Sequence, residues 1–360
     1  MMNSRERIIC TIQREKPDRI PSDIWATPEV LAELKKYLKA DSEQAIWSQL
    51  GIDKIVNLTP TPLGLPVTWC YAGPPLPPDT DIWGVRYLAK SYAEGRGVYW
   101  EMSFHPLATL DTVEAVEKHY RFPRVEDFDF SGLGEKCREY TEYAIECGYI
   151  SPFYIYNNIR GLEQSLMDLA FQPEYAHFVI ARICDFLYRF HERLFEMVGK
   201  DIDIAQVTDD FGMQSGLLIS PDMFREYFRP HYQKFIQLLK DCDILVFHHD
   251  DGAMAPLLPD LVDLGIDVLN PVQWRLPGMD PATLKKRFGD QLTFHGGIDN
   301  QQILSFGSRY DVEREVRFLL EALAPDGTGY IVAPCHNIQP ITSMENIVAL
   351  YQAVHHYGVL

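Results

Sequence analysis

The sequence lacks the features that mark several common classes of protein. Its seven cysteines are scattered and none stands in a C-x-x-C spacing, which argues against a disulfide framework and favours a reduced, cytoplasmic environment. No run approaches the roughly 20 apolar residues of a membrane helix, and the charged N-terminus does not resemble a secretory signal. Basic residues are in deficit, since 33 Lys and Arg against 51 Asp and Glu give a net charge of −18. This balance disfavours nucleic-acid and anionic-membrane partners.

Four motifs of known chemistry are also absent. The chain contains no G-x-G-x-x-G after a strand, no G-x-x-x-x-G-K-[ST], no H-E-x-x-H and no G-x-S-x-G. Nucleotide phosphate binding and serine hydrolase chemistry therefore have no support. What is present is a hydrophobic content of 46% with 12% aromatic residues in 360 residues, which is typical of a globular enzyme with a large core.

Eight apolar, β-rich runs alternate with helical patterns along the chain. They cover residues 19–25, 53–58, 149–156, 203–208, 243–249, 266–272, 292–298 and 330–336. Near-continuous apolar runs indicate parallel strands that are covered on both faces. Eight such strands alternating with helices predict an α/β fold, a (β/α)8 TIM barrel, with residues 1–360 as one domain.

Proline and capping residues mark several helix boundaries. The long amphipathic stretch 163–200 is predicted to form two helices that break near Pro173. Ser220 is expected to cap the next helix, with a proline in its first turn. Thr342 and Glu345 have the spacing of a capping box for the last helix.

Residues 60–105 depart from the strand–helix alternation. The segment is rich in proline and then offers two β-like runs, VRYLAKSY and GVYWEMSF, around a glycine-rich turn at Gly95 to Gly97. We expect a β-hairpin inserted into an early βα connection.

Polar residues collect at the predicted carboxyl ends of the strands, where barrels of this type place their active sites. The set comprises Asn157, Asn158, Arg160, Asp209, Asp210, His248, His249, Asp250, Asp251, Asn270, Gln273, His295, Asp299, Cys335, His336 and Asn337. Loops are polar everywhere, so a single Asp or Asn carries little weight. His–His–Asp–Asp and Cys–His are not turn-forming sequences, and a functional site is therefore favoured for the set as a whole.

The quartet "HHDD" at 248–251 divides by strand periodicity. His249 and Asp251 should share one face of the strand, and His248 and Asp250 the other. His249, Asp251 and Cys335 could together form a three-ligand zinc site with an open fourth position. In the alternative interpretation, Cys335 is an inert buried thiol and His249 contacts substrate through a hydrogen bond.

Several stretches resemble the uroporphyrinogen decarboxylase superfamily, particularly its methyltransferase branch. They are SRERIICTIQREKPDRIPSDIW, DDFGMQSGLLISPDMFREYFRPHYQKFI, FHHDDGAMAPLLPDLVDLGIDVLNPVQ, FHGGIDNQQIL and YIVAPCHNIQPITSMENIVAL. They span nearly the whole chain in family order. The resemblance implies a (β/α)8 barrel, as the strand count does.

The resemblance implies one of two chemistries. True decarboxylases of the family bind an octa-acidic tetrapyrrole through an arginine-rich N-terminal motif and use an aspartate in an FSDI-like strand end. The equivalent stretch here, SDIWATPEVL, has no arginine, and KIVNLTPTP after Asp53 has no later aspartate. Because eight carboxylates need cationic anchors, the decarboxylase interpretation is the weaker one.

The methyltransferase branch moves a methyl group from a corrinoid protein to a thiol such as coenzyme M, or to tetrahydrofolate. Its thiol-using members bind zinc through H-x-C on the fifth strand and a later cysteine on the eighth. In this sequence His249 and Cys335 match two of these positions, while Asp251 replaces the middle cysteine. A carboxylate keeps the charge but makes the site harder, so zinc is less certain than in the family pattern.

The first prediction is therefore a methyltransferase with zinc as its metal, a small-molecule methyl acceptor and a corrinoid carried by a partner protein. Its oligomeric state is left open, with a homodimer as one option. The catalytic residues would be His249, Asp251 and Asp210, and the zinc ligands would be His249, Asp251 and Cys335. The predicted substrate contacts are Asn158, Arg160, Gln214, Asn270, His295, Asp299 and His336.

Two alternatives stay open. A carboxy-lyase acting on a porphyrinogen or another acid would need arginines facing the cavity, and only Arg160 and Arg86 are available. A non-catalytic module that binds a tetrapyrrole or a corrinoid would need an open cavity and no metal.

Overall fold

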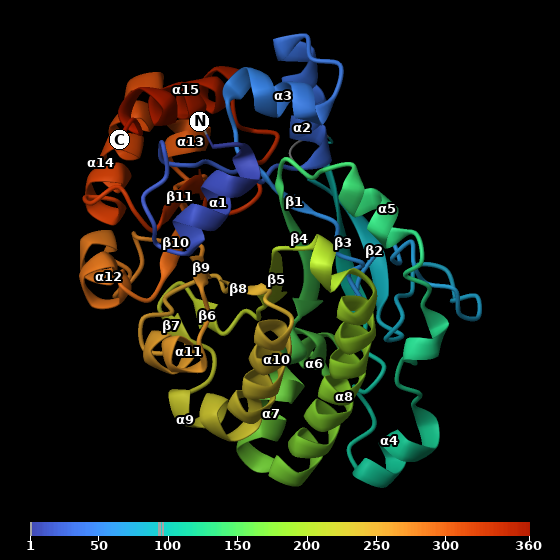
Figure 1. The fold of residues 1–360 in the computed structure, drawn as a ribbon. Helices are drawn as coiled ribbons and strands as arrows, with labels where there is room; N and C mark the ends of the chain where they lie inside the picture. The colour runs from blue at the N-terminus through green and yellow to red at the C-terminus, as the bar shows by residue number, and fades with distance from the viewer. Residues whose placement is uncertain (1, 93–94, 96) are drawn as a thin grey trace.

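A computed structural model describes residues 2–92, 95 and 97–360 of the chain (Figure 1). Its largest sheet has seven strands in the order β1-β4-β5-β8-β9-β10-β11, and every neighbouring pair is parallel. The strands are β1 (Ile55–Asn57), β4 (Ala144–Ile150), β5 (Ile204–Val207), β8 (Leu245–His249), β9 (Val268–Asn270), β10 (Thr293–Ile298) and β11 (Tyr330–Pro334).

The first predicted strand closes this sheet into a ring. Ser22 and Ala26 form parallel bridges to Val332 and Ile338, and the backbone N–H of Asp53 donates to the carbonyl of Ser22 at 2.9 Å. The segment around Ser22 therefore lies between β11 and β1 and supplies the eighth member of the barrel. The predicted (β/α)8 fold is confirmed.

Helix α1 (Ser4–Ile12) fills one end of the barrel. Its buried Ile8 and Ile12 pack in one cluster with strand residues that include Ile55, Phe247 and Ile331. Apolar side chains thus occupy the interior at this end, as expected of a packed barrel core. The functional groups are left to the opposite end, where the strands terminate.

Helices cover the outside of the ring (Figure 1). They are α2 (Pro28–Leu38), α3 (Glu43–Leu50), α4 (Val113–His119), α5 (Leu133–Arg138), α6 (Pro152–Arg160), α7 (Leu162–Phe171), α8 (Pro173–Val198), α9 (Pro221–Met223), α10 (Arg229–Asp241), α11 (Leu258–Leu264), α12 (Pro281–Phe288), α13 (Ile303–Phe306), α14 (Arg309–Leu323) and α15 (Met344–Tyr357). Short turns of other helix types are η2 (Val125–Asp127), η3 (Gly199–Asp201) and η4 (Phe224–Phe228).

Most of the predicted helix boundaries are confirmed. Helices α7 and α8 meet at Pro173, and the hydroxyl of Ser220 accepts a hydrogen bond from the backbone N–H of Met223. The predicted cap of the last helix was wrong by one residue. Ser343 caps α15, while the hydroxyl of Thr342 is hydrogen-bonded to Ser305 at 3.0 Å.

The prediction of a strand over 149–156 was wrong in position. The strand is Ala144–Ile150, and α6 begins at Pro152. This helix is buried on most of its faces, including Phe153, Tyr156 and Ile159, so its apolar run has no helical period that distinguishes it from a buried strand. The polar residues at its end therefore belong to a helix and do not mark a strand end.

The inserted hairpin is present as β2 (Arg86–Tyr92) and β3 (Gly97–Phe104), which pair antiparallel. Part of its predicted glycine turn, at residues 93, 94 and 96, lies outside the described residues. Tyr92, Val98 and Tyr99 line a hollow together with Thr27 and Gln339, which places the hairpin against loops at the carboxyl end of the barrel. A second, two-residue hairpin is formed by β6 (Gly212–Met213) and β7 (Gly216–Leu217).

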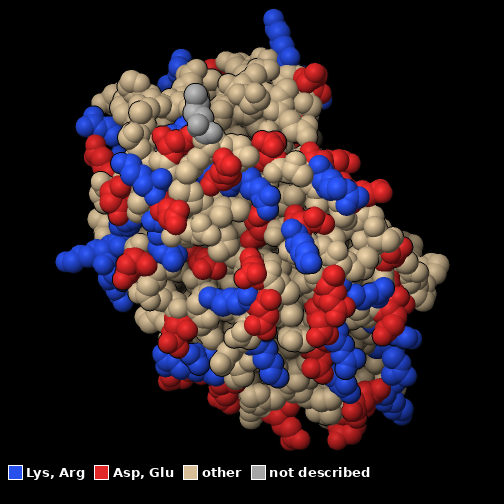
Figure 2. Space-filling model, in the orientation of Figure 1, with Lys and Arg blue, Asp and Glu red and all other residues tan. Residues whose placement is uncertain are grey.

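The chain has an excess of acidic residues. On the face seen in Figure 2, acidic and basic side chains are interspersed. Among the helices of residues 2–92, 95 and 97–360, none has the length and apolar character needed to cross a membrane.

Candidate functional site

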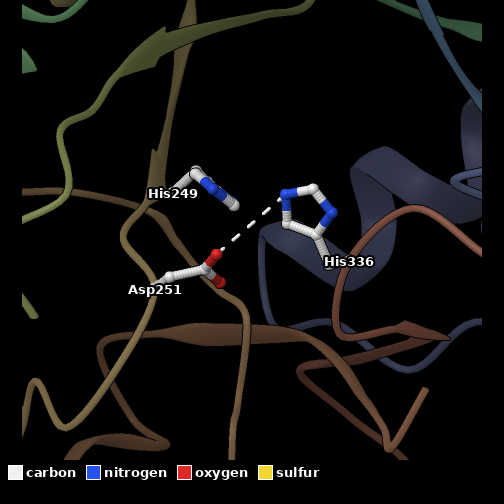
Figure 3. A group of neighbouring side chains, drawn as sticks. All are labelled: His249, Asp251 and His336. Carbon is white, nitrogen blue, oxygen red and sulfur yellow. Dashed lines mark ion pairs between the residues drawn. The ribbon is translucent and has the colours of Figure 1, made fainter. Parts of the chain in front are cut away.

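His249, Asp251 and His336 converge at the carboxyl end of the barrel (Figure 3). One ligand atom from each lies within 4.8 Å of the others, and the Nε2 of His336 is 4.0 Å from the Oδ2 of Asp251. His249 ends β8, Asp251 follows it, and His336 follows β11. The side chains are 15%, 36% and 48% exposed respectively, so the group is open to solvent on the side of His336.

The alternation predicted for the quartet is what the structure has. His248 and Asp250 are fully buried on the other face of the strand. Asp250 accepts hydrogen bonds from the backbone N–H groups of Phe211 and Gly212 at 3.1 and 3.0 Å, and the Nδ1 of His248 lies 2.6 Å from the carbonyl of Val207. This second pair ties together the ends of two neighbouring strands.

Asp251 is oriented by Gln273, whose side-chain amide donates to the Oδ1 of Asp251 at 2.8 Å. The amide oxygen of Gln273 in turn accepts from the backbone N–H of Gly252 at 2.8 Å. Burial raises the pKa of Asp251, although His249 and His336 act in the opposite direction. Asp210 borders the same group, with its Oδ1 4.0 Å from the Nε2 of His249.

A chain of buried polar groups lies behind His249. The Nδ1 of His249 is 2.6 Å from the Oδ1 of Asn270, the Nδ2 of Asn270 is 2.7 Å from the Nδ1 of His295, and the Nε2 of His295 is 3.1 Å from the Oδ2 of Asp23. Asn270, His295 and Asp23 are fully buried. The predicted substrate contacts at Asn270 and His295 are therefore not supported, because these side chains support His249 from within the core.

The structure does not place Cys335, predicted as a metal ligand, in this group, although Cys335 lines the same cavity as His336. Its thiol is buried and donates to the carbonyl of Val272 at 3.5 Å, and the sulfur does not join the group formed by His249 and Asp251. Burial raises the pKa of this thiol in the metal-free protein. The neighbouring His336, predicted as a substrate contact, takes the third position in the group.

Arg160 is a structural residue. Its buried guanidinium donates to Asp168 at 2.7 Å and to Asp111 at 3.1 Å, and also to the carbonyl of Leu107 at 2.5 Å. The predicted substrate contact at Arg160 is therefore not supported. Asn158 is buried on the same helix and is not among the residues that line the two cavities of the barrel mouth.

Two cavities meet at the histidine–aspartate group. One, of about 250 Å³, is lined by His336 and by the predicted contacts Gln214 and Asp299. The other, of about 400 Å³, is lined by His249 together with Trp25, Lys54, Asn57, Thr61, Tyr149 and Gln206. Asn337 lines both cavities, so the group lies on their common border.

The donor set of this group fits a divalent metal. Two imidazole nitrogens and one carboxylate oxygen are common ligands of zinc, and they leave a coordination position open. The Nδ1 of His249 is occupied by Asn270, which leaves Nε2 for a metal. The Nδ1 of His336 accepts from the backbone N–H of Asn337, so its neutral ring carries the proton on Nε2 and must release that proton before this nitrogen can bind a metal. Ligands of one zinc ion lie about 3.4 Å apart, so the half-exposed His336 would complete the site by a small movement together with loss of its Nε2 proton.

Sequence reasoning missed two residues that support this group. Asp23 is an acidic residue in an otherwise apolar run, IPSDIW, and this isolation was a signal that could have drawn attention to it. Gln273 was included in the polar set at the strand ends but was given no role.

Comparisons with known proteins place this site in a family. Residues 138–357 match the family model described as uroporphyrinogen decarboxylase (URO-D). The chain belongs to the URO-D family. The resemblance seen in the sequence is thereby confirmed.

Curated relatives in the URO-D comparison include two activities. Methylcobamide:CoM methyltransferase MtaA of Methanosarcina barkeri is 30% identical over 161 residues, which is 45% of this chain and 44% of that protein. Uroporphyrinogen decarboxylase of Dechloromonas aromatica is 27% identical over 103 residues, 29% of this chain and 27% of that protein. The chain thus spans less than half the length of the curated relatives it matches.

The URO-D fold is also shared with a solved methyltransferase from Methanosarcina mazei. That structure has a TM-score of 0.68 and 16% sequence identity over 99% of both chains. At this identity the likeness concerns the fold, and it agrees with the barrel described above.

Proposed function

We propose that this URO-D family protein is a methyltransferase that passes a methyl group from a methylated corrinoid, carried by a partner protein, to a thiol such as coenzyme M or to tetrahydrofolate. The observation that carries the proposal is the convergence of His249, Asp251 and His336 at the barrel mouth. A relative 30% identical over part of its length is named as a methylcobamide:CoM methyltransferase, which supports this choice within the family.

Zinc is the metal proposed for this site, with His249, Asp251 and His336 as its ligands. When bound, it would lower the pKa of an acceptor thiol and so favour the thiolate, which is the nucleophile in methyl transfer. The chain itself holds the ligands in place: Asn270 orients His249 and Gln273 orients Asp251.

The transfer needs two reactants at one point, and the two cavities on either side of the group suit this requirement. The acceptor sulfur or nitrogen forms a bond to the methyl carbon, the Co–C bond breaks, and the corrinoid leaves as Co(I) with the electron pair. The acceptor proton passes to a base, for which the half-exposed Asp210 beside His249 is the proposed residue. The β2–β3 hairpin borders the mouth and would contribute to docking of the corrinoid protein.

The carboxy-lyase alternative is disfavoured by the cations of the mouth. Lys54 and Arg275 are the Lys and Arg side chains among the described residues that line the two cavities. Lys54 is paired with Asp23 at 3.0 Å and Arg275 with Asp299 at 2.5 Å, so neither is free to hold a polycarboxylate. Arg86, the other candidate, lies on the hairpin with its guanidinium over the ring of Phe104.

Methyl transfer can be measured with the purified full-length protein, methylcobalamin and either coenzyme M or tetrahydrofolate, by the absorbance change as cobalamin loses its methyl group. We expect turnover with one acceptor, dependent on added zinc and lost in His249→Ala. Cys335→Ala is the matched control and should keep the activity. Silence with both acceptors would contradict the proposed function, and loss of a carboxylate from uroporphyrinogen would favour the lyase alternative.

A further inference from the structure

The series of buried hydrogen bonds behind His249 ends at the carboxylate of Asp23. Asp23 is fully buried, and its Oδ1 receives the Nζ of Lys54 at 3.0 Å and the backbone N–H groups of Ile24 and Ile55 at 2.7 and 3.1 Å. Its Oδ2 receives the indole N–H of Trp25 at 3.0 Å as well as the Nε2 of His295. Every neighbour is a donor, which is the environment of an ionised carboxylate.

The charge of Asp23 is favoured despite its burial. Burial alone would raise the pKa of this carboxyl, but Lys54 and His295 together hold the pKa well below its usual range. A carboxylate can only accept hydrogen bonds, so His295 must donate from Nε2.

The proton position of His295 in turn fixes the proton positions of the next groups in this series of hydrogen bonds. A neutral His295 that carries its proton on Nε2 has a lone pair on Nδ1, which must accept from the amide NH2 of Asn270. The amide oxygen of Asn270 then faces His249 and must accept from its Nδ1–H. His249 is left with an unprotonated Nε2, and this atom faces Asp210 and the other members of the group.

We propose that Asp23, acting through His295 and Asn270, sets the tautomer of the neutral His249 ring so that its Nε2 presents a lone pair to the barrel mouth. These three are positioning residues. That the lone pair serves a metal rests on the proposed function, whereas the tautomer itself does not.

The tautomer matters because free histidine favours the opposite form, with the proton on Nε2. In that form His249 would present an N–H group to the mouth and could not ligate a metal without first losing or moving a proton. Fixing the proton on Nδ1 in advance removes this cost, which is the role that outer-shell acceptors have at metal sites.

Asp23→Asn is the variant that should reverse the direction of donation in each hydrogen bond between residue 23 and His249. Three donors converge on the Oδ1 position against two on Oδ2, which favours the oxygen of the new amide at Oδ1 and its NH2 toward His295, while the indole N–H of Trp25 loses its acceptor. His295 must then accept at Nε2 and donate from Nδ1, Asn270 must turn over, and His249 must carry its proton on Nε2.

Two-bond ¹H–¹⁵N spectra of histidine-labelled, metal-free protein at about pH 8.5, well above the ordinary histidine pKa of about 6.5, report each tautomer directly. We expect Nδ1–H for His249 in the native chain and Nε2–H in Asp23→Asn. His191 is an internal control, because its Nε2 accepts from the backbone N–H of Tyr149 and its Nδ1 faces the carbonyl of Leu187. An Nε2–H form of His249 in the native chain, or an unchanged pattern in Asp23→Asn, overturns the proposal.

A second pair of variants covers the case in which Asp23→Asn does not fold. Asn270→Asp keeps an acceptor for His249 and should keep its Nδ1–H form, whereas Asn270→Leu removes the acceptor and should release the Nε2–H form. Zinc affinity is measured by competition with a chelating dye. It should fall about 10- to 100-fold in Asn270→Leu and stay equal to that of the native chain in Asn270→Asp. Identical histidine spectra for the two variants would refute the inference. Because the spectra are recorded without metal or substrate, a failure of methyl transfer would leave this result intact.

Discussion

The pairs His248–Asp250 and His249–Asp251 have the same two residue types and the same spacing, yet they have opposite environments. The first pair is fully buried and its hydrogen bonds go to backbone groups of the neighbouring strand end. The second is partly exposed at the barrel mouth and is held by the side chains of Asn270 and Gln273.

This contrast shows how a strand end separates structure from chemistry. Because side chains alternate along a strand, one histidine points outward to the surrounding helices and the next points toward the mouth of the barrel. Cys335 and His336, which follow β11, also differ, since the thiol donates to the carbonyl of Val272 and the imidazole reaches the group. Side-chain direction, and not residue type, decides which member of each pair can react.

The largest expected effect comes from His249→Ala. Removing one of three proposed ligands should lower zinc affinity at least about 100-fold, more than the usual effect of an outer-shell change, while the melting temperature changes little. His248→Ala is the matched control, for which we expect a lower melting temperature and little change in zinc affinity. Equal loss of zinc affinity in both variants would abolish the distinction between the two pairs.

Asp250→Ala tests the buried pair. The backbone N–H groups of Phe211 and Gly212 would lose their acceptor inside the protein. We expect the free energy of unfolding to fall by about 3 kcal/mol in a urea titration, with zinc affinity retained. Asp250→Asn, which keeps one acceptor oxygen, should recover part of this loss. A variant as stable as the native chain would show that the buried pair has no structural role.

Glu146, a buried carboxyl on β4, provides a second comparison with the partly exposed residues of the mouth, through the dependence of stability on pH. Glu146 accepts hydrogen bonds from Asn57 and Gln206, and burial raises its pKa to about 7. The folded state therefore keeps a proton that the unfolded chain releases near pH 4, so stability must fall as pH rises. Between pH 5 and 7 the native chain should lose about 2 kcal/mol relative to Glu146→Gln.

The measurement is a urea titration of both proteins at several pH values. A difference that stays constant across this range would mean that Glu146 is ionised in the folded protein.

The smallest expected effect is that of Cys335→Ala. The thiol lies outside the group, so zinc affinity should change by less than about threefold, or ~0.6 kcal/mol. Isothermal titration of the metal-free variant provides the measurement. A loss greater than tenfold would restore Cys335 as a ligand and remove the distinction from His336.

The sequence was sufficient for the barrel and for the face of β8 that carries the site. Its apolar runs identified the strands because each is buried on both faces, and the period of two separated His249 from His248. The prediction of a strand at 149–156 failed, because α6 is as buried as a strand and its apolar residues show no helical period.

The third member of the group could not be chosen from the sequence. Cys335 and His336 are neighbours that line the same cavity, and the path of the backbone after β11 decides which of them joins the group. The support of His249 by Asn270, His295 and Asp23 was equally hidden, because Asp23 is 272 residues away from His295 along the chain.

Barrel closure and preparation of His249 depend on the same segment. Asp23 belongs to the stretch that completes the ring between β11 and β1, and its backbone N–H donates to Val332 there. An incompletely folded chain, with this stretch detached, would leave His295 without its anion and His249 free to hold its proton on either nitrogen. Closure of the ring and the tautomer proposed for His249 would thus be lost together if this stretch were detached.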